Sequence, residues 1–196
     1  MKKIAITGGI GSGKSTVLKI LREEGYIAFS CDEIYKEITL EKEYIEKISA
    51  HFPATVEQGV INKKTLANIV FSNDEKRELL DSIAHPFIMK RLEEKIENCK
   101  ADVVFAEVPL LFEGGYYTLF DEIIVVKRAL NERINAVVLR DGSNEQDVLN
   151  RINSQFDYQS KDGEDFIEKI GAKILNNDSD IGDLKSRFKL LINELM

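Results

Sequence analysis

Residues 4–16 read Ile4-Ala5-Ile6-Thr7-Gly8-Gly9-Ile10-Gly11-Ser12-Gly13-Lys14-Ser15-Thr16, and this stretch decides the fold. Gly8, Gly13, Lys14 and Ser15 match the phosphate-loop pattern of a glycine, four residues, a second glycine, a lysine and a serine or threonine. A short apolar run precedes the pattern, as a buried strand would, and apolar residues follow it at helical spacing. The glycines therefore lie between a predicted strand and a predicted helix, which is the context that the motif requires.

The chemistry of phosphate binding explains these residue types. Glycines let successive backbone N–H groups point at a polyphosphate, and the helix that follows adds its own free N–H groups and the positive end of its dipole. We expect Lys14 to reach the β- and γ-phosphates and the Ser15 hydroxyl to bind Mg²⁺. A glycine-rich turn without chemistry is the alternative, and the complete pattern disfavours it. The predicted ATP-binding residues of the loop are Gly8, Gly11, Ser12, Gly13, Lys14, Ser15 and Thr16.

Composition limits the class of protein. The chain has 196 residues, of which 43% are hydrophobic and 31% charged, and this suits one α/β domain with a substantial core. A formal net charge of −7 argues against broad electrostatic binding to nucleic acid or to a membrane surface. Cys31 and Cys99 are too few for a disulfide framework. We expect a cytoplasmic monomer with no signal peptide, membrane span, nucleic-acid partner or membrane partner.

A second strand is predicted at residues 26–29, and it delivers Asp32 to its carboxyl end. In open α/β sheets the ligand lies beyond the carboxyl ends of the strands. Asp32 is therefore either a base or an orienting acceptor for the hydroxyl that attacks the γ-phosphate, or it is the N-cap of the next helix.

Helical patterns fill residues 33–100, with predicted helices at 64–71, 74–83 and 86–97. Such a stretch is longer than a crossover needs, so we expect a lobe over the site. Pro86 fits the first turn of the last of these helices. His85 is either a structural group or a ligand contact.

Two later strands are predicted, at residues 102–107 and 123–126. The first ends in Glu107, where phosphate-loop enzymes hold a second acidic residue close to Mg²⁺. Glu113 is the alternative acidic group, unless it only closes the turn at Gly114 and Gly115. The second strand is uniformly apolar, which indicates burial on both faces.

Arginines mark the segment after these strands. Arg133 and Arg151 lie on two predicted helices, at residues 133–139 and 145–155, and Arg140 directly follows the first of them. Together they indicate a lid whose guanidinium groups bind phosphate. Surface ion pairs are the alternative for each arginine taken singly. Ser143 and Gln146 suggest a capping box for the second helix. Residues 157–165 are predicted to be loose, before a last strand at 172–177 and a helix at 183–195.

Several segments together resemble the dephospho-coenzyme A kinase family, over nearly the whole chain. The resemblance rests on Thr7 to Thr16, Leu80-Asp81-Ser82-Ile83-Ala84-His85-Pro86-Phe87-Ile88, Val108-Pro109-Leu110-Leu111-Phe112-Glu113 and Arg151-Ile152-Asn153-Ser154-Gln155. It implies a phosphate-loop kinase with a central parallel sheet, a helical acceptor-binding lobe and a helical lid. The core would be residues 1–32, 101–128 and 170–196, the lobe 33–100 and the lid 129–165.

The resemblance also implies a reaction and its residues. The γ-phosphate of ATP, with Mg²⁺, would pass to the ribose 3′-hydroxyl of dephospho-CoA, in the last step of coenzyme A synthesis. Asp32 becomes the base, Lys14 and Arg140 act on the phosphate, and Asn177 lies near the adenine. Ser15 and Glu107 would serve the metal. The implied acceptor-binding residues are Thr7, Asp32, His85, Pro109, Leu110, Leu111 and Glu113.

Three departures from the family pattern stand out. Ser30 replaces a frequent first carboxylate, so Asp32 carries that role alone. Arg133 and Arg140 are seven residues apart, whereas the paired lid arginines of the family are usually four apart. Gly171-Ala172 replaces the usual Ala-Asp before the last strand. A nucleoside or nucleotide kinase would share the loop and lid but would not explain the His85 and Pro109 segments. A regulatory GTPase would require a guanine-reading motif, which this sequence lacks. A nucleic-acid motor is disfavoured by the acidic charge and short chain.

Overall fold

The computed structural model describes residues 1–71 and 73–196, and Ser72, inside the predicted acceptor lobe, lies outside the described residues. The chain forms two compact units. The first comprises Met1–Phe29 and Ala101–Met196, and the second comprises Ser30–Lys100.

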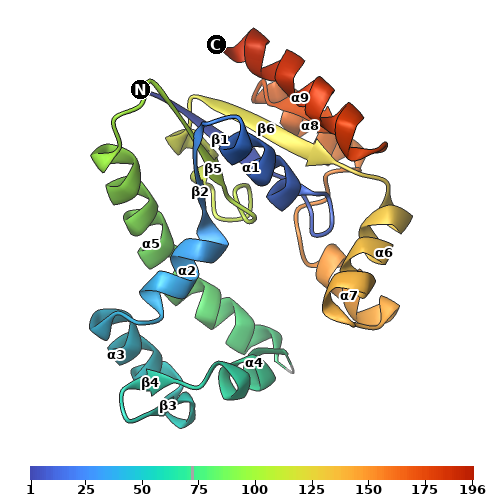
Figure 1. The fold of residues 1–196 in the computed structure, drawn as a ribbon. Coiled ribbons are helices and arrows are strands. Elements are labelled where there is room, and N and C mark those ends of the chain that lie inside the picture. The colour runs from blue at the N-terminus through green and yellow to red at the C-terminus, as the bar shows by residue number, and fades with distance from the viewer. Residues whose placement is uncertain (72) are drawn as a thin grey trace. The chain divides into compact units, whose positions relative to one another are not determined.

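A five-stranded sheet forms the centre of the first unit (Figure 1), in the order β2-β5-β1-β6-β7. β1 pairs in parallel with β5 and β6, and β6 pairs in parallel with β7. This confirms the predicted α/β fold with a central parallel sheet. The strands are β1 (Lys2–Thr7), β2 (Ile27–Ser30), β5 (Val103–Glu107), β6 (Glu122–Lys127) and β7 (Lys173–Asn176).

Helices and a short 3-10 turn complete this unit. The core joins alternate residues of the strands, such as Ile4 and Ile6, to Val17 of the first helix and Phe188 of the last one. Ile123 to Val126 are all buried, which confirms that β6 is covered on both faces. The elements are α1 (Lys14–Glu23), η2 (Tyr116–Leu119), α6 (Leu130–Asp141), α7 (Glu145–Asn153), α8 (Lys161–Lys169) and α9 (Ile181–Leu195).

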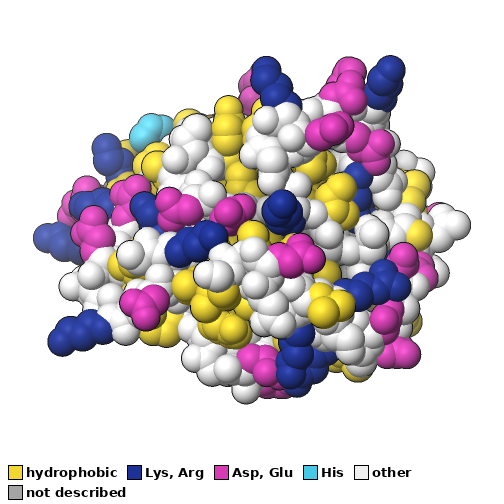
Figure 2. All heavy atoms as spheres, turned by 90° about the horizontal axis from the view of Figure 1, so that it is seen from above, with side chains coloured by type: hydrophobic (Ala, Val, Ile, Leu, Met, Phe, Trp, Pro, Cys, Tyr) yellow, Lys and Arg dark blue, Asp and Glu magenta, His cyan; other side chains and the backbone are white. Residues whose placement is uncertain are grey.

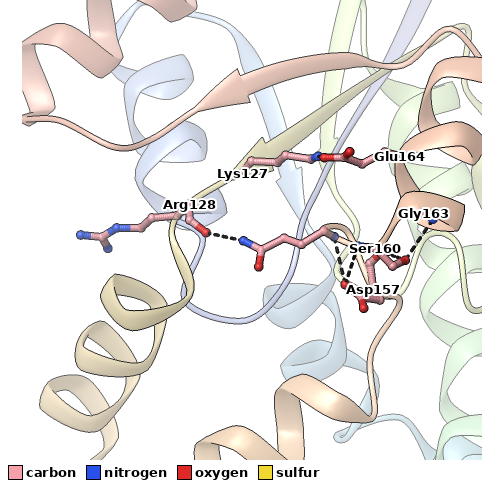
Figure 3. A network of polar contacts seen from close by, with 7 residues as sticks. Lys127, Arg128, Asp157, Ser160, Gly163 and Glu164 are labelled. Carbon is pink, nitrogen blue, oxygen red and sulfur yellow. Dashed lines mark hydrogen bonds and ion pairs between the residues drawn. The ribbon is translucent and has the colours of Figure 1, made fainter.

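The segment predicted to be loose, 157–165, is instead ordered by local hydrogen bonds (Figure 3). The Ser160 hydroxyl accepts from the Gly163 N–H at 3.1 Å and so caps α8, while Asp157 Oδ1 accepts from the Ser160 N–H at 3.1 Å. Lys127 pairs with Glu164 at 2.8 Å, which ties α8 to the end of β6. The prediction was wrong because it was based on the polar first turn of α8, whereas the apolar residues that indicate a helix come after that turn.

The predicted capping box at Ser143 and Gln146 is also wrong. Asn144 is the N-cap of α7, and its side-chain oxygen accepts from the Asp147 N–H at 2.9 Å. The helix therefore starts one residue later than the Ser143 cap requires.

Helices dominate the second unit. α5 packs against α2, α3 and α4, and Tyr44 of α3 meets the rings of Tyr35 and Phe87 edge-on. A short antiparallel hairpin occupies the stretch around Val60. The elements are α2 (Cys31–Ile38), α3 (Lys42–His51), η1 (Pro53–Thr55), β3 (Val56–Glu57), β4 (Val60–Ile61), α4 (Lys63–Phe71) and α5 (Asp74–Asn98).

Pro86 does not begin a helix, contrary to the prediction. It lies inside α5, which runs unbroken from Asp74 to Asn98. A proline within a helix costs about 3 kcal/mol, because its N–H is missing and its ring crowds the preceding turn. Ala84 and Leu92, on either side of Pro86, are buried, and the packing of α5 against α2, α3 and α4 offsets this cost.

Charged side chains of both signs are interspersed on the face drawn in Figure 2. Ion pairs join side chains of opposite charge at the surface; for example, Glu24 pairs with Lys185 at 2.9 Å and with Lys189 at 3.1 Å. In residues 1–71 and 73–196, no helix combines the length and apolar character that a membrane crossing requires.

Candidate functional site

The glycine-rich loop joins β1 to α1, and its backbone adopts conformations that favour glycine. Gly8 has φ 143° and Gly13 has φ 100°. A Cβ on Gly8 would collide with the Val126 carbonyl, and one on Gly13 would collide with the side chain of Asn177. Glycine is required at these two positions for both reasons, strain and close approach.

Lys14 folds back onto this loop. Its ammonium donates to the carbonyl of Gly8 at 2.7 Å and to that of Gly9 at 3.2 Å, and the residue is only 9% exposed. The Gly9 carbonyl also accepts from the Ser12 N–H at 3.1 Å. A positive charge is thus held against the carbonyls of the loop, where its low exposure leaves it weakly screened by water.

Other predicted nucleotide residues surround the start of α1. Ser15 is exposed and Thr16 is half-buried, and the Thr16 N–H donates to the Gly13 carbonyl at 3.0 Å. Asn177 donates from Nδ2 to the Ser12 carbonyl at 2.8 Å. The structure therefore brings the predicted adenine residue to the loop from the far end of the chain.

Glu107 ends β5 beside the strand that enters the loop. It pairs in register with Ile6, and the Val108 N–H donates to the Ile6 carbonyl at 2.9 Å. The side chain is buried, with 5% exposure. Carboxylate and hydroxyl oxygens are hard ligands that suit Mg²⁺, so Glu107 and Ser15 are of the right chemistry.

No cluster of three or more His, Cys, Asp or Glu side chains suited to a metal occurs within the described residues. Kinase sites bind Mg²⁺ through one or two carboxylates together with substrate phosphates, so they do not require such a cluster.

Asp32 lies in the first turn of α2 and is exposed to solvent. The N-cap of this helix is Ser30, so the alternative interpretation of Asp32 as the cap is wrong. An Asp in the first turn is favoured by the positive end of the helix dipole. The carboxylate is therefore not engaged as the N-cap.

His85 is half-buried inside α5, one helical turn after Asp81. Burial raises the pKa of the Asp81 carboxyl above its ordinary value, while the charges of His85 and Arg77 oppose that rise. The second unit thus carries an acid and an imidazole on neighbouring turns of one helix.

The segment from Pro109 to Glu113 forms a tight turn after β5. Leu111 is buried, whereas Pro109 and Leu110 are half-buried. Glu113 is exposed, and its Oε1 accepts from the Phe156 N–H at 2.7 Å. This contact ties the turn to the segment that follows α7.

Phe112, in the same turn, is the centre of an aromatic cluster. Its ring lies 4.8 Å from that of Phe156 and 5.8 Å from that of Tyr158, and it also meets the rings of Tyr117 and Phe166. The cluster gives the turn after β5 a rigid, apolar support.

Arg140 and Arg151 share one carboxylate. Arg140 donates to both oxygens of Asp141, at 2.7 and 2.9 Å, and Arg151 Nη1 reaches Asp141 Oδ2 at 3.3 Å. These hydrogen bonds, first of all that from Arg140, lower the pKa of Asp141. The ion pairs considered as the alternative for these arginines are therefore present.

Sequence reasoning missed three contacts to the loop. Arg133, only 6% exposed, donates from Nε to the Ile10 carbonyl at 2.9 Å, and Gln155 Oε1 accepts from the Ile10 N–H at 2.7 Å. The Tyr158 hydroxyl lies 3.1 Å from Thr7 Oγ1, and burial raises its pKa. Gln155 ends one of the family-like segments, which was a signal; the sequence around Tyr158 gave none.

A phosphate loop between the first strand and first helix, beside a five-stranded parallel sheet flanked by helices, defines this protein as a phosphate-loop kinase. The dephospho-CoA kinase family model matches residues 2–183, and the chain belongs to that family. It is therefore an ATP-dependent kinase of coenzyme A biosynthesis, and the recognition made from sequence is confirmed.

Individual relatives agree with this assignment. A dephospho-CoA kinase of Thermus thermophilus is 34% identical over 98% of this chain and 91% of its own, and one of Fusobacterium nucleatum is 37% identical over 92% of each. Among solved structures, a Thermus thermophilus protein superposes with a TM-score of 0.81 at 33% identity, covering 100% of this chain and 98% of its own. Dephospho-CoA kinase from Campylobacter jejuni gives 0.65 at 27%, with the same coverage.

Proposed function

We propose that the protein transfers the γ-phosphate of ATP to the ribose 3′-hydroxyl of dephospho-CoA, giving coenzyme A and ADP. The observation that carries this proposal is the family match over residues 2–183. Within the proposal, residues 33–100 form the acceptor-binding lobe and residues 129–165 form the lid.

The phosphates of ATP bind at the loop. The Lys14 ammonium exchanges the carbonyls of Gly8 and Gly9 for the β- and γ-phosphate oxygens, which carry full negative charge. Ser12 supports phosphate binding at the loop, because its buried hydroxyl has no hydrogen-bond partner among the described residues and can donate to a phosphate oxygen. Asn177 lies near the adenine.

Ser15 and Glu107 hold Mg²⁺ in this proposal. The ion neutralises charge on the β- and γ-phosphates when it is bound. The position of Glu107 supports the assignment, because its buried carboxylate ends β5 in register with Ile6, just before the loop.

The remaining roles concern the acceptor. Asp32 accepts the proton of the attacking 3′-hydroxyl, and its position in the first turn of α2 leaves the carboxylate exposed for that purpose. Arg140 stabilises charge on the transferring phosphoryl group. The acceptor itself is bound by Thr7, His85, Pro109, Leu110, Leu111 and Glu113.

A panel of acceptors tests the proposal. ADP release from Mg-ATP is measured with dephospho-CoA, adenosine, nucleoside monophosphates, shikimate and water alone, and mass spectrometry identifies the product. We expect turnover with dephospho-CoA only. Turnover with a nucleoside or nucleotide would keep the loop assignment and overturn the acceptor, and hydrolysis without acceptor preference would overturn the proposed transfer.

A further inference from the structure

Ile10, in the middle of the phosphate loop, is contacted by the two-helix segment α6–α7 and the residues just after it. Its N–H donates to Gln155 Oε1 at 2.7 Å, and its carbonyl accepts from Arg133 Nε at 2.9 Å. Its side chain packs on the apolar cluster of Ile134, Val137 and Val148. One loop residue thus has both backbone groups and its side chain engaged by the same segment.

The first of these hydrogen bonds fixes the peptide between Gly9 and Ile10. The peptide bonds of the described residues are trans, so the N–H and C=O of one peptide point in opposite directions. When Gln155 holds the Ile10 N–H, the Gly9 carbonyl is turned to the other side. That carbonyl accepts from the Lys14 ammonium at 3.2 Å and from the Ser12 N–H at 3.1 Å.

The second hydrogen bond fixes the next peptide, between Ile10 and Gly11. Because Arg133 holds the Ile10 carbonyl, the Gly11 N–H points away from Arg133. The N–H groups of such loops are the donors that bind phosphate. The direction of this donor is therefore set by a side chain of α6, outside the loop itself.

We infer that Gln155 and Arg133 are positioning residues, which hold the two peptides around Ile10 so that the Gly9 carbonyl keeps the Lys14 ammonium at the loop and the Gly11 N–H is oriented for nucleotide phosphates before ATP arrives. This inference rests on the phosphate-binding role proposed for the loop. Without these two bonds, the loop must order itself at the expense of binding free energy.

The burial of Arg133 distinguishes its contact from an incidental surface hydrogen bond. Arg133 is buried, and burial lowers the pKa of its guanidinium, so keeping this charge inside the protein is costly. A hydrogen bond to the Ile10 carbonyl offsets part of that cost. Tyr158 adds a third contact, to Thr7 at the end of β1, on the amino-terminal side of the loop.

The substitution Gln155→Met tests the inference, because it keeps the length and neutrality of the side chain and removes the acceptor for the Ile10 N–H. Gln146→Met is the matched control: Gln146 is exposed on α7, and its side-chain amide donates to Asn150 Oδ1 at 3.2 Å. Hydrogen exchange of the Ile10 amide is measured without nucleotide, and the Kd for ATP and both KM values are measured alongside Tm.

In Gln155→Met we expect faster exchange at Ile10 and an ATP affinity about three- to tenfold weaker, the range that one net hydrogen bond supplies. The KM for the acceptor should stay within about twofold of its original value, because the lost hydrogen bond lies at the phosphate loop. Gln155→Glu keeps the acceptor oxygen, so exchange at Ile10 should remain slow in that variant. Gln146→Met should resemble the original protein in every measurement.

An Ile10 amide as protected in Gln155→Met as in the control would overturn the inference, and so would an unchanged Kd for ATP. A fall in ATP and acceptor affinity that only follows a fall in Tm would show a structural role instead. The amide exchange, the Kd for ATP and the Tm do not depend on which acceptor the enzyme uses; only the acceptor KM does. The inference can therefore stand if the acceptor assignment fails.

Discussion

Replacing Lys14 by methionine should remove most of the catalytic power while leaving most of the stability. Methionine preserves the length of the side chain and deletes the ammonium that donates to the Gly8 and Gly9 carbonyls. Hydrogen bonds from a charged group are worth about 1.5–3 kcal/mol each, and this gain is offset in part by the cost of burying the ammonium. For a chain of this size, that corresponds to a Tm lower by about 2–4 °C for each kcal/mol.

The effect on the reaction is much larger. A unit charge about 4 Å from the transferring phosphoryl group, at an effective dielectric constant of about 20, contributes about 4 kcal/mol. Because about 1.36 kcal/mol corresponds to a tenfold change in rate, kcat should fall by about a thousandfold. The low exposure of Lys14 justifies this dielectric constant over that of water.

The assay is ADP release with dephospho-CoA at saturating ATP, with a thermal melt of the same sample. Lys19→Met is the control, since Lys19 is an exposed residue of the same helix whose contact with Glu23, at 3.9 Å, is a surface ion pair. If Lys14→Met kept kcat within about tenfold of this control, the charge-stabilisation estimate would be wrong.

Three further predictions concern other parts of the chain. Asp32→Asn should lower kcat by about 10²-fold or more if Asp32 is the general base, with Tm nearly unchanged; a lower Tm with normal kcat would assign it a structural role. Phe112→Ala, at the centre of the aromatic cluster, should cost about 3–5 kcal/mol in urea unfolding, and Phe112→Leu clearly less; equal losses would contradict the packing argument. Burial raises the pKa of Asp81, so its contribution to stability is complete below the unfolded pKa of about 3.9 and is lost as pH rises through the folded pKa. The Tm of Asp81→Asn minus the Tm of the original protein should therefore be larger at pH 7 than at pH 4. An identical pH dependence of the two melts would refute this sign.

The sequence predicted the elements whose local pattern and environment agree. The loop needs glycine where the backbone has positive φ, and the strands β1, β5 and β6 are apolar because the sheet is buried on both faces. In these stretches a few adjacent residues are enough to indicate the backbone conformation or the burial. That is why the fold class followed from a short motif and its flanking elements.

Pro86 shows where local rules fail. Its missing N–H and its ring predict a break, yet α5 continues because long-range packing on both sides outweighs the local cost. α8 was missed for a related reason. Its stability comes from the Ser160 cap and from the burial of Ile167, and a window centred on its polar first turn contains little of this information.

The candidate site was predictable only in part. The motif identified the loop residues, but the partners of Ile10 are 123 and 145 residues away in the chain, and their contacts depend on tertiary structure. The seven-residue spacing of Arg133 and Arg140 left the role of Arg133 open, and the structure gives these two arginines different environments. Arg133 is buried against the loop, whereas Arg140 lies exposed beside Asp141.

The most direct test of the central claim is the position of the new phosphate in the product. The protein is incubated with Mg-ATP and dephospho-CoA, and the product is analysed by mass spectrometry and ³¹P NMR, with authentic coenzyme A as the standard. The account predicts a single phosphorylated product identical to coenzyme A, with a monoester at the ribose 3′-hydroxyl. A phosphate at any other hydroxyl, or ADP formed without a phosphorylated acceptor, would contradict it.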